Sequence, residues 1–349
     1  MIRPLFYYRF LFALALLSLL ATFCVNSQGQ QPVAPPPGLE LTPSGNGVKL
    51  ARARESFSTL SLEGSDLQPR PPMSTDHEKN EDFARELVRL QWRPNDPIDM
   101  YVIRPANVKN PPVVLYLYSF PSRLDRFRNN PFCTRLVRNG AAAVGFLSAR
   151  TGYRAEHGPM KQWFISELPE SLASTVHDVQ LILNYLATRG DLDMSRVGMF
   201  GQGSGGAIAI LAAAADARLK ALDLLDPWGD WPDWLAKSYV VPKVERDQYV
   251  KADFLKPLEP LEPVRYLPQL ASRAIRIQFC DQEMSDVKDA VAKLEAAAPA
   301  TAKTLHFYNG RMMYAENSDG RLFEWIATAL KSPAETQPAT AKTPALTSH

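Results

Sequence analysis

The sequence has little of what metal sites and nucleic-acid interfaces require. It holds 3 cysteines and 5 histidines in 349 residues. The cysteines form no C-x-x-C pair, and the histidines lack the spacing of a ligand pair, which argues against a zinc site. The net charge is only +2, and Lys and Arg are scattered along the chain, which argues against nucleic acid as a partner. We therefore predict no metal, no cofactor and no nucleic-acid partner.

Long hydrophobic runs are also scarce, and the clearest one lies at residues 10–25. It follows two arginines and precedes small residues, which is the pattern of a secretory signal peptide at residues 1–27. The run falls short of the roughly 20 residues that a membrane-spanning helix needs. We predict a secreted or periplasmic protein. The alternative is an uncleaved anchor at residues 10–25, which would then be the chain's contact with a membrane.

Composition separates the ends of the chain from its middle. Residues 28–75 are rich in Pro, Gly, Ser and Gln, and residues 332–349 in Ala, Thr, Pro and Lys. Such segments cannot bury enough apolar surface to offset the entropy lost on ordering. We therefore predict a disordered linker at 28–75, one folded domain at 76–331 and a disordered tail at 332–349.

Within the domain, apolar runs typical of strands alternate with segments typical of helices. This alternation predicts an α/β fold, in which a mostly parallel sheet carries helices on both faces. Strands are expected at residues 86–92, 98–103, 112–118, 141–147, 196–200, 221–225, 275–279 and 304–308. Helices are expected at residues 124–138, 168–188, 207–215, 284–297 and 321–331.

A glycine-rich turn joins the strand at 196–200 to an alanine-rich helix. Strand, turn and helix resemble the nucleophile elbow of the α/β-hydrolase family, whose pattern is G-x-S-x-G. The resemblance covers residues 86–331. It implies an esterase- or peptidase-type hydrolase fold with an eight-stranded sheet and a small cap insert at 226–270. The elbow residues are Gly201, Gln202, Gly203, Ser204 and Gly205.

The nucleophile position of this elbow holds Gly203, which has no oxygen for attack on a substrate. Ser204 comes one residue later, where a side chain points along the first turn of the helix. Serine also suits the start of a helix as a capping residue. We interpret Ser204 first as a helix-start residue and second as a displaced nucleophile.

The other triad positions are also unusual. The resemblance implies the chain order nucleophile, acid, histidine. Asp281 or Glu283 would supply the acid, although both also suit the first turn of a helix, and Asp226 occupies a second acid position used in some branches of the family. The histidine position holds Met313, which cannot accept a proton. His157 is the histidine that the loop after the fourth strand brings nearest to the cleft.

In open α/β sheets, ligands bind outside the carboxyl ends of the strands. A pocket is therefore expected there, with the backbone N–H groups of Phe120 and Ser204 matching an oxyanion hole. Its further candidate residues are Tyr118, Ser119, Trp228, Arg311 and Met313.

We hypothesise an exported hydrolase-like protein that has lost catalysis and binds a small molecule or a protein partner in this cleft. The alternatives are an active serine hydrolase that uses Ser204 with His157, and an interaction protein whose pocket is vestigial.

Overall fold

A computed structural model describes residues 55–62, 69, 71–93, 96–152, 154, 164–311 and 321–331. The predicted signal peptide, the predicted tail, His157 and Met313 lie outside these residues.

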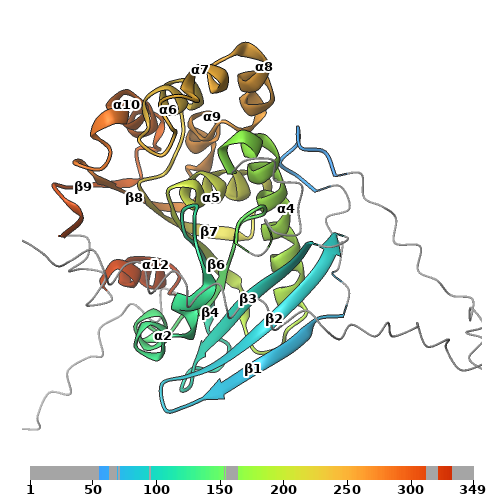
Figure 1. The fold of residues 1–349 in the computed structure, drawn as a ribbon. Helices are drawn as coiled ribbons and strands as arrows, with labels where there is room; N and C mark the ends of the chain where they lie inside the picture. The colour runs from blue at the N-terminus through green and yellow to red at the C-terminus, as the bar shows by residue number, and fades with distance from the viewer. Residues whose placement is uncertain are drawn as a thin grey trace, which may run out of the picture. The chain divides into compact units, whose positions relative to one another are not determined.

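The described residues form one nine-stranded sheet (Figure 1). Three pairings on one side are antiparallel, β1 with β2, β2 with β3 and β3 with β5, and the remaining pairings are parallel. The strand order is β1 (Met73–Lys79), β2 (Phe83–Arg93), β3 (Asp96–Pro105), β5 (Ala142–Phe146), β4 (Pro112–Leu117), β6 (Asp193–Gln202), β7 (Leu219–Leu225), β8 (Ala274–Cys280) and β9 (Lys303–Phe307).

The α/β architecture with a mostly parallel sheet is as predicted, but the sheet has one strand more than the eight expected. The additional strand is β1 at the edge. Its sequence, MSTDHEK, is largely exposed and lacks the alternation of apolar and polar residues that identifies a half-buried strand. Its pairing with β2 therefore left no sequence signal.

Helices cover both faces of the sheet. Alternate residues of β4 belong to two separate hydrophobic clusters, with Val113 and Leu115 in one and Val114 and Tyr116 in the other, because successive side chains of a strand point to opposite faces. Helices α4 (Leu168–Ala187), α5 (Ser204–Ala215) and α10 (Lys288–Ala297) pack into the first cluster, and α2 (Asn130–Val137) and α12 (Glu324–Ala329) into the second (Figure 1). In the described part of the chain, no helix combines the length and the apolar character needed to cross a membrane.

The helix predicted at 124–138 is instead two elements. A 3-10 helix η1 (Leu124–Arg128) ends at Asn129, and α2 begins directly after it. The Asn129 side chain accepts a hydrogen bond from the Phe132 N–H, and Pro131 lies in the first turn of α2. Asparagine at the cap and proline in the first turn are both strong helix-start signals, and they explain the break.

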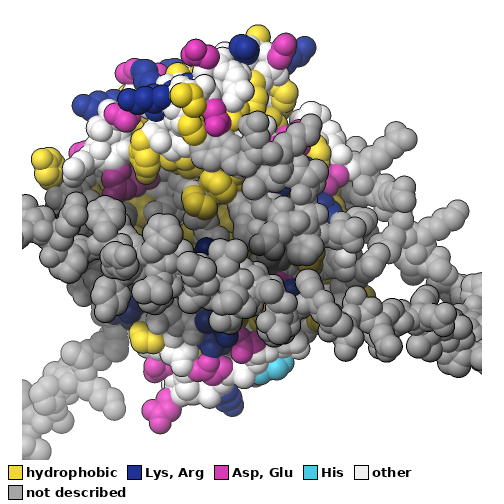
Figure 2. Space-filling model, in the orientation of Figure 1, with side chains coloured by type: hydrophobic (Ala, Val, Ile, Leu, Met, Phe, Trp, Pro, Cys, Tyr) yellow, Lys and Arg dark blue, Asp and Glu magenta, His cyan; other side chains and the backbone are white. Residues whose placement is uncertain are grey.

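The insert between β7 and β8 consists of short helices. Its elements are α6 (Trp231–Lys237), α7 (Arg246–Tyr249), α8 (Ala252–Leu255), η3 (Lys256–Leu261), α9 (Pro263–Tyr266) and η4 (Leu267–Leu270). Figure 2 shows positive and negative side chains interspersed over the top of the molecule, where α6 to α8 and α10 lie. This face therefore presents no field of a single sign. The other short elements are η2 (Phe164–Glu167), η5 (Ser285–Val287) and η6 (Arg321–Phe323).

The folded domain begins earlier than predicted, because residues 55–62 pack against α4. Leu62 is buried, and its N–H donates to Gln180 Oε1 at 3.1 Å. Glu55 pairs with Arg93 at 2.6 Å and lies 2.8 Å from His177 Nδ1. Composition predicted that this segment belongs to a linker. Composition could not show that buried polar side chains of α4 form their hydrogen bonds with residues 55–62.

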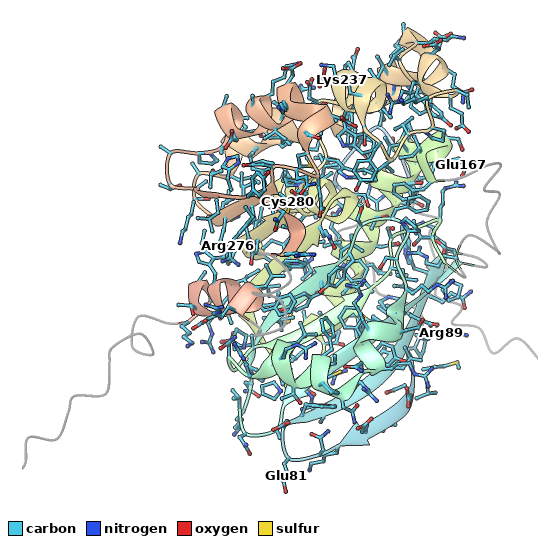
Figure 3. The ribbon with its side chains drawn as sticks, turned by 60° about the vertical axis from the view of Figure 1, so that its left-hand side comes forward. Glu81, Arg89, Glu167, Lys237, Arg276 and Cys280 are labelled. Atoms are coloured by element: carbon cyan, nitrogen blue, oxygen red, sulfur yellow. The ribbon has the colours of Figure 1, made fainter. Side chains whose placement is uncertain are left out.

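Buried charges inside the sheet are also paired. Arg276 of β8, labelled with Cys280 in Figure 3, lies 2.7 Å from Asp223 of β7 and donates to the Leu322 carbonyl. Both side chains are buried, which requires such compensation. The cross-strand pair therefore links β7 to β8 beneath the edge at which the candidate site lies.

Candidate functional site

The turn from β6 to α5 is sharp, and it requires glycines because side chains at its positions would overlap neighbouring atoms. Gly203 lies at φ 55° and ψ −116°, a conformation that residues with side chains rarely adopt. A Cβ on Gly201 would lie 2.3 Å from the Gly205 carbonyl oxygen. A Cβ on Gly205 would lie 2.1 Å from the Leu117 carbonyl oxygen. Backbone therefore approaches backbone too closely for side chains at these flanking positions.

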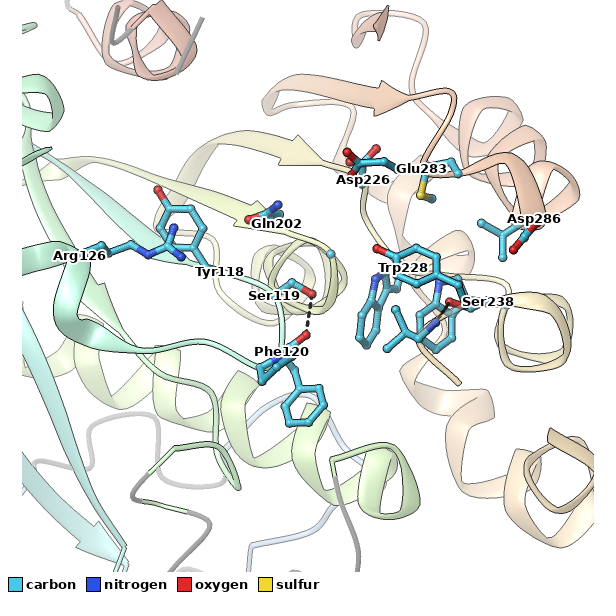
Figure 4. A pocket seen from close by; sticks show the side chains of 17 residues that line it. Tyr118, Ser119, Phe120, Arg126, Gln202, Asp226, Trp228, Ser238, Glu283 and Asp286 are labelled. Atoms are coloured by element: carbon cyan, nitrogen blue, oxygen red, sulfur yellow. Dashed lines mark hydrogen bonds between the residues drawn. The ribbon is translucent and has the colours of Figure 1, made fainter. Parts of the chain in front are cut away.

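Ser119 occupies the space in which a side chain on Gly203 would project. A Cβ built on Gly203 would lie 2.3 Å from Ser119 Oγ and 2.7 Å from Ser119 Cβ. Ser119 comes from the loop after β4, and its hydroxyl lies 3.3 Å from the Phe120 carbonyl oxygen, the contact drawn in Figure 4. The position of a nucleophile side chain is therefore filled by a serine from another strand end.

Ser204 is the first residue of α5, and Gly203 is its N-cap. Its side chain is fully buried, and its Oγ accepts a hydrogen bond from the Phe120 N–H at 3.0 Å. The Ser204 N–H in turn points to Ser119 Oγ at 3.4 Å. The two N–H groups predicted as an oxyanion hole thus both face hydroxyls of the protein itself, and the Ser204 hydroxyl is withdrawn from the cavity.

A cavity of about 610 Å³ lies at the carboxyl end of the sheet, next to the elbow (Figure 4). It brings together most of the predicted candidates: Tyr118, Ser119, Phe120, Gln202, Gly203, Asp226, Trp228 and Glu283. Sequence reasoning assigned no site role to the other lining residues: Pro121, Arg126, Trp234, Ser238, Tyr239, Val240, Met284, Asp286 and Val287. Arg126 lies in η1, where nothing in the sequence signalled a site. Trp234 and Tyr239 lie in the insert that was expected to cover the pocket.

Asp281 and Arg311 do not line this cavity. The Asp281 carboxylate is exposed and lies 2.6 Å from His306 Nδ1, and His306 Nε2 lies 2.6 Å from Glu295 Oε1. Hydrogen bonds to these two carboxylates raise the pKa of His306. Asp281 therefore belongs to a surface cluster. Arg311 is exposed, with its N–H on Asn309 Oδ1.

Asp226, at the end of β7, is the buried carboxylate of the cavity. It is 8% exposed and adopts φ 46°, and its Oδ1 accepts the Cys280 N–H at 2.7 Å. Burial, opposed by the Cys280 N–H and reinforced by the nearby carboxylates of Glu283 and Asp281, raises the pKa of Asp226 to about 6. This carboxyl group consequently titrates near neutral pH.

One group of side chains has the spacing of a metal site. Ligand atoms of Asp226, Cys280 and Glu283 lie within 4.8 Å of one another. Burial and the neighbouring carboxylates raise the pKa of the Cys280 thiol well above its ordinary value. A thiol that keeps its proton is a poor ligand, because metals bind the thiolate. We assign no metal to this group.

The raised pKa of Asp226 makes stability depend on pH. The folded state holds this proton up to about pH 6, whereas the unfolded chain releases it near 3.8. The free energy of unfolding is therefore expected to fall as pH rises from 4 to 7, by about 2.4 kcal/mol from this group. Asp226→Asn, which suits the positive φ, should lack that loss. Urea unfolding of both proteins at several pH values checks this, and parallel profiles would refute it.

The start of the insert is a packed aromatic cluster that borders the cavity. The Trp228 and Trp234 rings lie 4.1 Å apart, and Trp231 packs edge-on against Trp234. Trp231 Nε1–H donates to the Leu261 carbonyl at 2.8 Å. Trp228 and Trp234 also line the cavity, and Tyr239, further along, is 68% exposed. Residues of the insert therefore form one wall of the cavity.

Comparison with known proteins identifies the fold. No protein-family model and no curated protein matches the sequence. Among solved structures, the chain is similar to an acetyl xylan esterase from Paenibacillus sp. R4, with 16% identity, 76% of this chain and 90% of that chain covered, and a TM-score of 0.58. It is also similar to acetyl xylan esterase 1 from Thermoanaerobacterium sp. JW/SL YS485, with 12% identity, 74% and 89% coverage and a TM-score of 0.54.

A third similar structure is an S-formylglutathione hydrolase from Agrobacterium tumefaciens, with 14% identity, 74% of this chain and 99% of that chain covered, and a TM-score of 0.55. All three cover most of both chains at low identity, and the likeness therefore concerns the backbone. Together with the parallel sheet, the sharp turn after β6 and the insert after β7, it shows that this chain has the α/β-hydrolase fold.

Proposed function

We propose that this protein is an exported, catalytically degenerate relative of the esterases, which binds a small molecule in the cavity beside the elbow. One observation carries the proposal: the place of a nucleophile side chain on Gly203 is taken by Ser119. Acyl transfer by this fold needs an oxygen at that place and free N–H donors for the developing oxyanion. Here the Phe120 and Ser204 N–H groups already face protein hydroxyls.

The cavity supports binding rather than a purely vestigial role. Its volume of about 610 Å³ lies within the range of small-molecule sites, and its lining combines aromatic walls with a few polar groups. Export rests on the pattern of residues 1–27. A protein partner that inserts a side chain into the same cavity is the alternative occupant.

Labelling with a fluorophosphonate probe tests the loss of catalysis. Because Ser204 Oγ is buried and accepts the Phe120 N–H, we expect no covalent label on the full-length protein. The rate of p-nitrophenyl acetate hydrolysis should differ less than about twofold between the parent protein and Ser204→Ala. The parent protein has no activated serine nucleophile, so the substitution removes none.

Mass spectrometry locates any label. A label on Ser204 that disappears in Ser204→Ala, together with a fall in ester hydrolysis, would favour the active serine hydrolase instead. A label on Ser119 would also contradict the proposal, because it would show that the serine at the nucleophile place reacts.

A further inference from the structure

The cavity is asymmetric in charge. Asp226, Glu283 and Asp286 lie on one side, and Arg126 lies on the other beside Tyr118 (Figure 4). The Arg126 guanidinium stacks on the Tyr118 ring, 3.6 Å from its centroid. Glu283 and Asp286 are exposed, and no ion pair joins either of them to a described residue. One side of the cavity is therefore a region of uncompensated negative charge.

The indole N–H of Trp228, a mostly buried residue, is a hydrogen-bond donor at the same cavity. Trp228 is 4% exposed, and its Nε1 lies 3.1 Å from where a Cβ on Gly203 would be. Within the described residues, its indole N–H has no hydrogen-bond acceptor, in contrast to Trp231, whose Nε1–H reaches the Leu261 carbonyl. An acceptor atom of a ligand in the cavity would receive the hydrogen bond of this indole N–H.

Aromatic rings stand beside the carboxylates. Trp228 and Trp234 pack against each other with tilted rings and line the cavity, and Tyr239 lines it as well. Tyr239 is close enough to Glu283 and Asp226 for their charges to help burial raise its pKa. A cation bound between carboxylates and aromatic faces gains both charge pairing and cation–π attraction. Repulsion from Glu283 also helps to raise the pKa of Asp226, and a bound cation would relieve that repulsion.

We infer that the cavity takes a ligand that carries an ammonium or guanidinium group together with a hydrogen-bond acceptor. The cation lies on the side of Asp226, Glu283 and Asp286, and the acceptor oxygen receives the Trp228 Nε1–H. This inference rests on the proposed binding function and names its ligand class. A volume of about 610 Å³ admits a molecule the size of a substituted amino acid or a short peptide.

Two matched probes test the inference by calorimetry on the full-length protein. N-acetyl-arginine methylamide carries one cation and carbonyl acceptors, and N-acetyl-citrulline methylamide is its neutral near-isostere. We expect the arginine probe to bind at least about tenfold more tightly, because only its charged group can pair with the carboxylates and lie against the aromatic faces. Equal affinities, or no binding of the arginine probe up to 10 mM, would overturn the inference.

Variants locate the interaction. Glu283→Gln should remove most of the preference for arginine, whereas Glu259→Gln, the same charge change on an exposed residue of η3 outside the cavity lining, should leave it intact. Trp228→Phe should weaken both probes, because it removes the donor on which the acceptor of each probe depends. Unchanged binding in Glu283→Gln would place the cation elsewhere and refute the assignment. The labelling experiment tests the proposed function separately, so failure of either claim is distinguishable.

Discussion

Gly203→Ser is expected to destabilise the fold by about 2–5 kcal/mol, and Ser119→Gly is expected to restore about 1–3 kcal/mol of that loss. A Cβ at position 203 would lie 2.3 Å from Ser119 Oγ and 2.7 Å from Ser119 Cβ, and the backbone there has a positive φ. Removing the Ser119 side chain relieves the overlap but leaves the backbone strain. Urea unfolding of the two single variants and the double variant measures this coupling.

Gly190→Ser is the matched control, because a Cβ there would have nothing within 4 Å and the backbone has no positive φ. Its effect should stay within about 0.5 kcal/mol. Additive effects of Gly203→Ser and Ser119→Gly would contradict the placement of Ser119. An attempt to restore catalysis would place serine and histidine at the two triad positions, with Gly203→Ser and Met313→His. It would consequently require Ser119→Gly as a third change.

Asp178→Ala is expected to cost about 2–4 kcal/mol, because it takes one carboxylate from two buried guanidinium groups, which keep only Glu55 and Asp96 as partners. Asp178 is fully buried in α4, where its carboxylate lies 2.6 Å from Arg93 Nη1 and 2.8 Å from Arg154 Nη2. It also accepts the Trp92 Nε1–H at 2.9 Å. The free energy of unfolding from urea titrations measures the loss.

Asp289→Ala provides the comparison, since Asp289 pairs with Lys237 at 2.6 Å on the surface. Exposed ion pairs contribute little to stability, and this variant should unfold like the parent protein. A similarly small effect of Asp178→Ala would mean that the two guanidinium groups find water or other acceptors, and that the network is not a determinant of stability.

The fold was largely predictable from the chain, because its central strands are continuous apolar runs. Val113 to Leu117 and Val197 to Phe200 are buried on both faces, which is what such runs indicate. The edge strand β1 and the segment at 55–62 were not predictable. Both are held by pairings with distant residues, β2 for one and α4 for the other, and neither contains a periodic apolar pattern.

The candidate site was predictable in its position but not in its internal contacts. The glycine pattern placed the elbow, and the rule for parallel sheets placed the cavity beside it. The hydrogen bond from the Phe120 N–H to Ser204 Oγ joins residues 84 positions apart. The position of Ser119 beside Gly203 likewise depends on the conformation of the loop after β4. Residue spacing in the sequence does not predict that conformation. Arg126 was missed for the same reason.

The packing of residues 55–62 on α4 also determines how the protein should be produced in the laboratory. A recombinant fragment that starts at residue 76 begins inside β1 and lacks Glu55, Thr59 and Leu62. Both ring nitrogens of His177 then lose their contacts with the Glu55 carboxylate and the Thr59 carbonyl. Apolar and charged surface of α4 becomes exposed, which favours aggregation over soluble yield. Expression vectors for crystallography or binding studies should therefore start upstream of Glu55.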